Sequence, residues 1–263
     1  MLAMVRALLE EGKLFTKFQA TRTADRVIYL IPEAGLSPFS ARLRTFRLTD
    51  YVGERLFVQT LSAKEPLSLT DARLLKAAEG ADVFLDTAVR FMQGDENDAS
   101  EQRAFAESLF RLQGAGARTI TGAHHSPKGF SKESVMTLEN VLRGSGDIGA
   151  MLVTAWGLKQ IDAVSNQVYV ANVKPRDFQP CEPFIIQGRP SLDETGYFEM
   201  PCPSGYAGKL EDYMPSRGRP EISDKDAKKA EAQRLKAQGM SLREIAPQLG
   251  ISKSKVGQLL QTR

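Results

Sequence analysis

The sequence has 263 residues, of which 42% are hydrophobic and 25% are charged, and its formal net charge is +3 at pH 7. This composition is ordinary for a soluble globular protein, and the length accommodates one large α/β domain or a core domain with a small appendage. No apolar run approaches the length needed to cross a bilayer, which excludes a membrane-spanning protein.

The N-terminal segment and the cysteines exclude two further classes. The stretch MLAMVRALLEEGK is apolar but is interrupted by Arg6, Glu10 and Glu11, so it predicts an amphipathic helix and not a signal peptide. The two cysteines, Cys181 and Cys202, stand far apart without a CxxC or Cys/His cluster. This arrangement argues against a zinc site and favours a reducing, cytoplasmic compartment.

Apolar runs that alternate with helical patterns predict a parallel sheet covered by helices over the first half of the chain. The expected elements are a helix over 2–11 that ends at Gly12, a strand in RVIYLIPEAG (26–35), a helix in LTDARLLKAAEG (69–80), a strand in ADVFLDT (81–87), a helix in SEQRAFAESLFRLQGAGA (100–117) and a strand in RTITGAHH (118–125). The runs at 26–35 and 81–87 are typical of strands that are buried on both faces.

The pattern changes after residue 128. The stretch SVMTLENVLRGSGDIGAMLVTAWGLKQID (134–162) predicts a helix with a glycine-rich interruption at 143–146. Two later stretches, QVYVANVKPRDF (167–178) and PFIIQGRP (183–190), predict further strands of the same sheet. The next region is rich in Gly, Pro and Ser, so we expect residues 201–222 to link a core domain at 1–200 to a small domain at 223–263.

The small domain is expected to contain three helices, at 226–239, 241–250 and 252–263, arranged as a helix-turn-helix. The residues that predict these helices are a capping box at Ser241 and Glu244, an N-cap at Ser252, and inward-facing Val256, Leu259 and Leu260. Residues 223–263 carry nine Lys/Arg against four Asp/Glu, whereas the other 222 residues carry 26 basic and 28 acidic residues. The positive excess therefore lies in this domain, which indicates a polyanionic partner.

Two acidic residues follow buried strands. Asp86 comes after VFL, and Glu33 comes after VIYLIP. At the carboxyl end of a parallel strand, Asp86 could hold Mg²⁺ beside the phosphates of a nucleotide, which is the Walker B arrangement. Glu33 on a neighbouring strand could orient and deprotonate an attacking water. The alternatives are an aspartate that caps the following helix and a surface glutamate at a strand end.

Both histidines of the protein, His124 and His125, end the third expected strand. Neighbouring residues of an extended chain point to opposite sides, so at most one of them is expected to face a γ-phosphate. No cysteine or acid stands nearby at ligand spacing, so the pattern favours a phosphate sensor over a metal site. A structural histidine is the alternative.

Five segments in a fixed order resemble the RecA-like ATPases of the RepA hexameric-helicase group, which are also called AAA family ATPases. They are RVIYLIPEAG, ADVFLDTAVRFMQGDENDAS, TGAHHSPKG, VLRGSGDIGAMLVTAWGLKQID and VANVKPRDFQPCEPF, and the resemblance covers residues 2–190. It implies an ATP- and Mg²⁺-dependent ring oligomer, such as a hexamer, that acts on DNA. It also implies that Glu33 activates water, that Asp86 is the Walker B aspartate, and that His124 or His125 couples the γ-phosphate to DNA-binding loops.

The same resemblance implies residues that reach into a neighbouring subunit. Arg143, in RGSGD, matches the position of an arginine finger, and Lys174 and Arg176, in KPR, resemble the Lys-x-Arg pair that DnaB-type helicases use in the same way. Such a finger stabilises the charge of the transition state. The alternatives are a helix-terminal arginine at position 143 and a solvated strand end at positions 174 and 176.

The sequence departs from this family at the phosphate-binding loop. The family places GxxxxGK[ST] directly before its first helix, but the motif does not occur in the 263 residues, and the sequence begins with the stretch that resembles that helix. We therefore expect the first strand and the P-loop to be missing, the sheet to have an unfilled strand position, and hydrolysis to be poor or absent. The chain would then be either a truncated or internally started product or a remnant.

The C-terminal stretch SLREIAPQLGISKSKVGQLLQ resembles the helix-turn-helix of resolvases and sigma factors. In that case the outward-facing candidates for DNA contact are Ser252, Lys253, Ser254, Lys255 and Gln258, and contacts of lysine with phosphate would make the affinity depend on salt. The alternative is a small protein-interaction module with a solvated basic face.

The sequence thus predicts a RecA-like α/β core, with a mostly parallel sheet flanked by helices, joined to a three-helix domain. The expected function is Mg²⁺-ATP hydrolysis in a ring oligomer, coupled to binding or translocation of DNA. The alternative is a non-enzymatic DNA-binding regulator that uses the helix-turn-helix, with the core as an oligomerisation platform.

Overall fold

Four parallel strands form the central sheet of the computed structural model. The structure describes residues 1–65, 67–92, 94, 98–127, 129–130, 133–142, 146–162, 166–190, 198–199, 207–213 and 222–261. The strands are β3 (Val27–Ile31), β4 (Leu56–Thr60), β5 (Asp82–Leu85) and β6 (Thr119–Gly122), and their order in space is β4-β3-β5-β6. The structure thus confirms the predicted parallel sheet, with β3 and β5 as neighbours.

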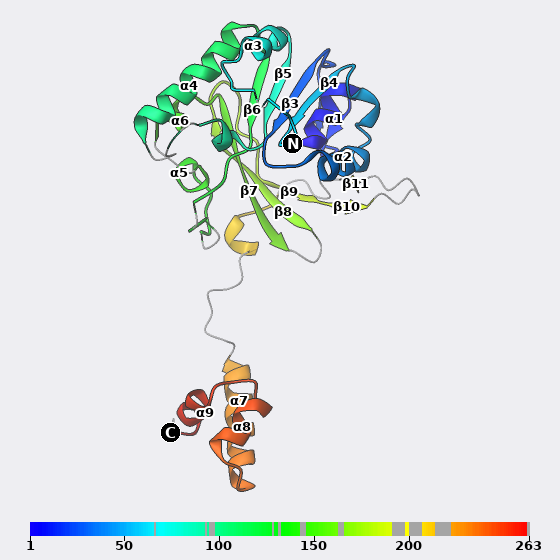
Figure 1. Cartoon of the computed structure of the whole chain (residues 1–263). Helices are drawn as coiled ribbons and strands as arrows, with labels where there is room; N and C mark the ends of the chain where they lie inside the picture. Colours follow the sequence, from blue (N-terminus) through cyan, green and yellow to red (C-terminus); the bar gives the residue numbers. More distant parts are fainter. Residues whose placement is uncertain are drawn as a thin grey trace. The chain divides into compact units, whose positions relative to one another are not determined.

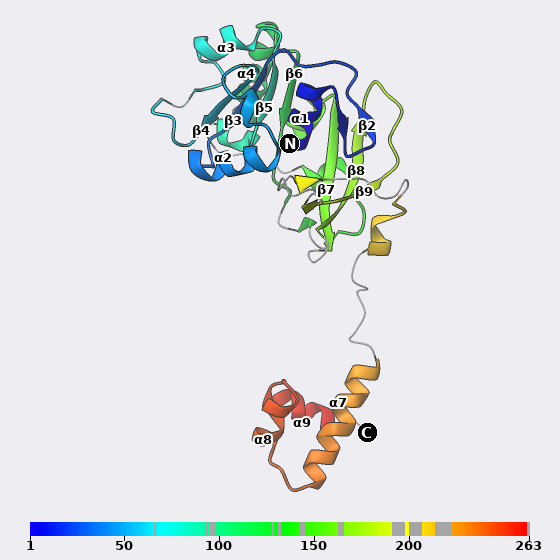
Figure 2. The ribbon, with the colours of Figure 1, turned by 90° about the vertical axis from the view of Figure 1, so that its right-hand side faces the viewer.

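Helices cover both faces of this sheet (Figures 1 and 2). On one face lie α1 (Leu2–Glu10) and α2 (Leu36–Thr45); on the other lie α3 (Ala72–Ala78), α4 (Ala99–Gly114) and α6 (Gly146–Met151). Alternate residues of β3 enter the two clusters: Tyr29 packs with α1 and α2, and its neighbours Ile28 and Leu30 pack with α3 and α4. The predicted burial of β3 on both faces is confirmed.

The helix ends follow local chemistry. Asp71 and Asp98 are the N-caps of α3 and α4, where their carboxylates accept hydrogen bonds from the backbone N–H groups of Arg73 and Ser100. At the end of α1 the left-handed residue is Glu11, with φ of 52°, and not the expected Gly12.

Three antiparallel strands form a second sheet, in the order β7-β8-β9. They are β7 (Thr154–Asp162), β8 (Gln167–Pro175) and β9 (Phe184–Gln187). Two predictions are therefore wrong. The stretch from Thr154 is a strand and not a helix, because it pairs along its length with β8, and within the described residues β8 and β9 do not pair with the parallel sheet.

Short elements complete this part of the chain. They are β1 (Lys13–Leu14), β2 (Phe18–Gln19), α5 (Leu138–Val141), β10 (Arg189–Pro190), β11 (Phe198–Glu199) and the 3₁₀ turns η1 (Thr49–Tyr51), η2 (Ala88–Phe91) and η4 (Leu210–Tyr213). Strands β1 and β2 form a hairpin whose Phe15 and Phe18 pack on Phe184, with ring centroids 6.2 and 5.3 Å away.

The chain divides into two compact units, Met1–Tyr213 and Met214–Arg263. Residues 207–213, which lie inside the stretch expected to be a linker, belong to the first unit. The backbone N–H of Ala207 donates to Pro183, and the hydroxyl of Tyr169 donates to Gly208. No helix in the described residues is long and apolar enough to cross a membrane.

The second unit contains three helices, α7 (Ile222–Ala237), α8 (Leu242–Gln248) and α9 (Lys253–Gln261). Its core includes Ala232 and Leu235 of α7, Ile245 of α8 and Val256 of α9. The capping box of Ser241 and Glu244 is confirmed, and the hydroxyl of Ser252 accepts a hydrogen bond from the N–H of Lys255 at the start of α9. The three predicted helices are confirmed.

Candidate functional site

The polar residues at the carboxyl edge of the parallel sheet form the candidate site. Glu33 follows β3, Asp86 follows β5, and His124 and His125 follow β6. Because β5 pairs with both β3 and β6, these three strand ends are neighbours. In α/β proteins, ligands bind outside the carboxyl ends of the strands.

Asp86 is held by a tyrosine from the neighbouring strand. The hydroxyl of Tyr29 donates to Oδ2 of Asp86 at 2.7 Å, and Tyr29 is only 1% exposed. Burial raises the pKa of Tyr29 far above its ordinary value, and the hydrogen bond and the negative charge of Asp86 raise it further. The hydroxyl therefore stays a donor. Oδ1 of Asp86 has no hydrogen-bond partner among the described residues.

Glu33 is held in a similar way by the turn that follows β5. Its Oε1 accepts hydrogen bonds from Nε of Arg90 and, at 3.3 Å, from the hydroxyl of Thr87. The hydrogen bond from Arg90 lowers the pKa of Glu33, whereas burial raises it. The hydrogen bond from Thr87 and the nearby charge of His125 lower this pKa further. Glu33 is therefore ionised at neutral pH, and its Oε2 has no partner in the described part of the chain.

The two histidines differ in environment. Nδ1 of His124 lies 2.9 Å from the carbonyl oxygen of His125, so we assign the proton of a neutral ring to Nδ1. Nε2 of His124 is buried and has no partner within the described residues. His125 is exposed and lies close enough to Glu33 to affect its pKa. His124 thus brings an unused ring nitrogen to the edge.

The amino group of Met1, at the start of α1, lies close enough to Asp86 for their charges to interact. Burial lowers the pKa of the Met1 amino group, and the attraction of Asp86 acts in the opposite direction. No side chain caps this end of α1. A helix N-terminus carries partial positive charge and free N–H groups, so this end of α1 places N–H donors near the carboxylate.

The predicted finger residues either bind groups of their own chain or lie outside the described residues. Nζ of Lys174 donates to the carbonyl groups of Gly149 and Ala150, and Nη2 of Arg176 donates to Ala150 at 2.9 Å. Both side chains thus bind the last turns of α6 in their own chain. Arg143 lies outside the described residues.

The donor set fits a magnesium ion that is held mainly by water and phosphate. Among the described residues no group of three or more His, Cys, Asp or Glu could hold a metal ion. Mg²⁺ usually takes one or two carboxylates from the protein and completes its shell with water and phosphate oxygens. Oδ1 of Asp86 is available for this role.

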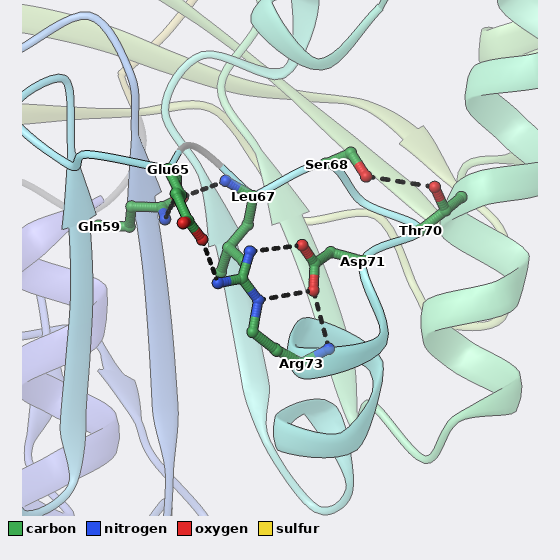
Figure 3. Close-up of polar contacts among 7 residues, drawn as sticks. All are labelled: Gln59, Glu65, Leu67, Ser68, Thr70, Asp71 and Arg73. Atoms are coloured by element: carbon green, nitrogen blue, oxygen red, sulfur yellow. Dashed lines mark hydrogen bonds and ion pairs between the residues drawn. The ribbon is translucent and has the colours of Figure 1, made fainter.

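A groove with a volume of about 430 Å³ lies beside β4 and α3, and its lining includes Leu30, Phe57 and Leu74. It is mainly apolar, and its polar rim is already paired. In Figure 3 the guanidinium of Arg73 binds both Asp71 and Glu65, and the amide of Gln59 bonds to the backbone of Glu65 and Leu67. Within the described residues, the paired rim leaves this groove mainly apolar, in contrast to the carboxyl edge.

The second unit presents a polar surface on α9. The candidate DNA-contacting residues are all exposed, whereas Val256 and Leu259 are buried and Leu260 packs against the core, as predicted. The exposed candidates are Ser252, Lys253, Ser254, Lys255 and Gln258.

Three residues of the site were not predicted from the sequence: Tyr29, Thr87 and Arg90. For Tyr29 a signal exists, because it is the only polar side chain in the apolar run VIYLI. A buried hydroxyl needs a partner. Thr87 and Arg90 stand in TAVRF after Asp86 without any pattern that distinguishes them from ordinary turn residues.

The sheet order and the helices on both faces define a mixed α/β fold, with a parallel four-stranded sheet flanked by helices, of the RecA-like kind. No family model and no curated protein matches the chain. Among solved structures, a DnaB-like replicative helicase, described together with its interactions with primase, matches 76% of this chain with a TM-score of 0.51 and 13% identity. The match covers 54% of that protein, so the chain spans about half of its length. At this identity the similarity shows the fold.

Proposed function

We propose that the protein is a RecA-like ATPase of the helicase type, related to the RepA group, that couples Mg²⁺-ATP hydrolysis in a ring oligomer to binding or translocation of DNA. The observation that carries this proposal is the pair Asp86 and Glu33 at adjacent carboxyl ends of β5 and β3. Each carboxylate has one oxygen held by the fold and one without a partner in the described residues.

The roles follow from these positions. Oδ1 of Asp86 would hold the metal directly or through water, and Mg²⁺ when bound would offset the negative charge of the phosphates. Oε2 of Glu33 would orient a water and accept its proton. Nε2 of His124 is the better placed of the two histidines to respond to a phosphate, because it is buried and unpaired among the described residues.

A finger role for Arg143, Lys174 or Arg176 belongs to this proposal as well. Lys174 and Arg176 would have to exchange their bonds to α6 for a bond to a nucleotide in a neighbouring subunit. The carbonyl groups that they would leave are at a helix end, where water can replace them.

The 263 residues contain no GxxxxGK[ST], so we propose that this chain by itself hydrolyses ATP poorly or not at all. The lysine and backbone N–H groups of that motif are what normally bind the β- and γ-phosphates. Among the described residues, the N–H groups at the start of α1 are the donors that we propose in place of this motif, because the amino group of Met1 lies close enough to Asp86 for their charges to interact.

Metal binding tests the proposal apart from turnover. Mn²⁺ would be titrated into the chain with a non-hydrolysable ATP analogue and followed by electron paramagnetic resonance, beside the variant Asp86→Asn. We expect the unsubstituted chain to bind Mn²⁺ more tightly than the variant, with little or no release of phosphate from ATP. Equal Mn²⁺ affinities would exclude the role of Asp86.

A second candidate function is a DNA-binding regulator without enzymatic activity, favoured by the exposed basic residues of α9. In this case residues 214–263, produced alone, would retain most of the DNA affinity of the full chain, and nucleotides would not change it. A large loss of affinity in the fragment would favour DNA binding by the core.

A further inference from the structure

Tyr29 carries a hydroxyl into an apolar layer where its ring alone would suffice for packing. The ring lies between Phe39 and Phe84, with centroid distances of 5.3 and 5.9 Å, and is nearly parallel to that of Phe84. A phenylalanine would fill the same space. Removing a hydroxyl from water is costly unless it forms a hydrogen bond, so the oxygen of Tyr29 must be explained by its partner, Asp86.

The register of the sheet brings the two groups together. Tyr29 on β3 lies opposite Phe84 on β5, and Asp86 stands two residues further along β5. Residues two apart in a strand point to the same face and are separated by roughly 7 Å along it. The phenol ring spans this distance, so its hydroxyl meets the carboxylate on the face covered by α1 and α2.

This bond limits the orientation of the carboxylate. With Oδ2 bound to Tyr29 at 2.7 Å, rotation about the Cβ–Cγ bond of Asp86 would break a partly buried hydrogen bond, which is unfavourable. Oδ1 is thereby kept in one place. Hydrogen bonds to ligand carboxylates commonly set the metal affinity of a site in this way.

We propose that Tyr29 is a positioning residue that holds Asp86 ready for a divalent cation. The proposal rests on the metal role proposed for Asp86, and it assigns a function to a core residue that touches neither the metal nor the nucleotide. It predicts that the hydroxyl of Tyr29 contributes to metal affinity separately from its contribution to folding.

The test compares Tyr29→Phe with a matched variant, Tyr169→Phe, in the full chain. Tyr169 is also buried, at 3% exposed, and its hydroxyl donates to the backbone carbonyl of Gly208 at 3.0 Å. It lies in β8 of the other sheet. Mn²⁺ affinity in the presence of the non-hydrolysable ATP analogue is measured by electron paramagnetic resonance, and stability by thermal unfolding.

We expect Tyr29→Phe to weaken Mn²⁺ binding by about tenfold or more, while Tyr169→Phe leaves it unchanged and both variants unfold at similarly reduced temperatures. Equal affinity in Tyr29→Phe and the unsubstituted chain would overturn the positioning role alone. An equal loss in both variants would also overturn it, because the effect would then be structural. If the unsubstituted chain bound Mn²⁺ no better than Asp86→Asn, the metal role and the positioning role would both be wrong.

Discussion

The two lysines at the start of α9 allow a quantitative prediction about DNA binding. Lys253 and Lys255 are exposed and form no ion pair within the described residues. If each contacts one phosphate of duplex DNA, the double variant Lys253→Ala/Lys255→Ala should reduce the slope of log affinity against log salt by about 1.8, which is about 0.9 for each contact. Between 50 and 200 mM salt, two such contacts account for a roughly 12-fold change in affinity.

Fluorescence anisotropy with a labelled duplex would measure the affinity of the full chain across this salt range. The control is the double variant Lys64→Ala/Lys76→Ala, which removes the same charge from exposed positions of the first unit. The control should keep the original slope. A slope that is unchanged in the α9 variant, or reduced equally in both, would refute the assignment of α9 as the DNA-contacting helix.

Three further predictions concern the first unit. In any form of the protein that hydrolyses ATP, Glu33→Gln should lower kcat by about 10²–10⁴ with nucleotide affinity retained; an unchanged kcat would remove Glu33 from the mechanism. Arg90 lowers the pKa of Glu33 in the folded state. Their pair therefore contributes its full stability at pH values above the ordinary pKa of glutamate, about 4.3. This contribution is lost as the pH falls through the lower pKa of the folded state. Arg90→Ala should therefore lower the free energy of unfolding at pH 7 by under about 1 kcal/mol, because Arg90 is mostly exposed. The loss should shrink as the pH is lowered towards 3 in thermal unfolding; equal losses at both pH values would contradict this. Thr16 is a β-branched residue with φ of 59°, so Thr16→Gly should stabilise the chain by about 1 kcal/mol in urea unfolding. A loss would contradict this, because the side-chain interactions of Thr16, such as its hydroxyl bond to the carbonyl of Phe15, would then outweigh the strain.

The elements that could be predicted are those whose signal is local. The runs VIYLI and DVFL are mostly apolar, and all nine of their residues are buried, so their strand character was visible without any knowledge of their partners. The same holds for α3, whose N-cap Asp71 starts it in the expected place. In these cases the neighbouring residues along the chain are enough.

The missed elements have weak local signals. Strand β4 reads LFVQT and lies at an edge of the parallel sheet, with Phe57 41% exposed and Gln59 used to bind a loop. Helix α2 starts at Leu36 after an uncapped Gly35 and contains few apolar residues. Both elements exist because β3 and its cluster provide surface for them, which the sequence of either stretch does not show.

The error at β7 has a different cause. The stretch TAWGLKQID follows α6 after a short gap and contains residues that suit a helix as well as a strand. Its pairing with β8 determines the outcome, since that pairing runs from Thr154 to Asp162 with two irregularities. Tertiary context commonly overrides local propensity in this way.

The candidate site shows the same division between local and long-range information. Asp86 and Glu33 could be found because each directly follows a buried strand and parallel strands share a carboxyl edge. Tyr29 and Arg90 act on these carboxylates from positions 57 residues away in the chain, through the register of β3 with β5 and the turn after β5. A buried polar side chain in an otherwise apolar strand needs a hydrogen-bond partner. A carboxylate at the end of the neighbouring strand is within its reach. In other sequences, such a polar residue therefore indicates which strand-end carboxylate is held in place by the fold.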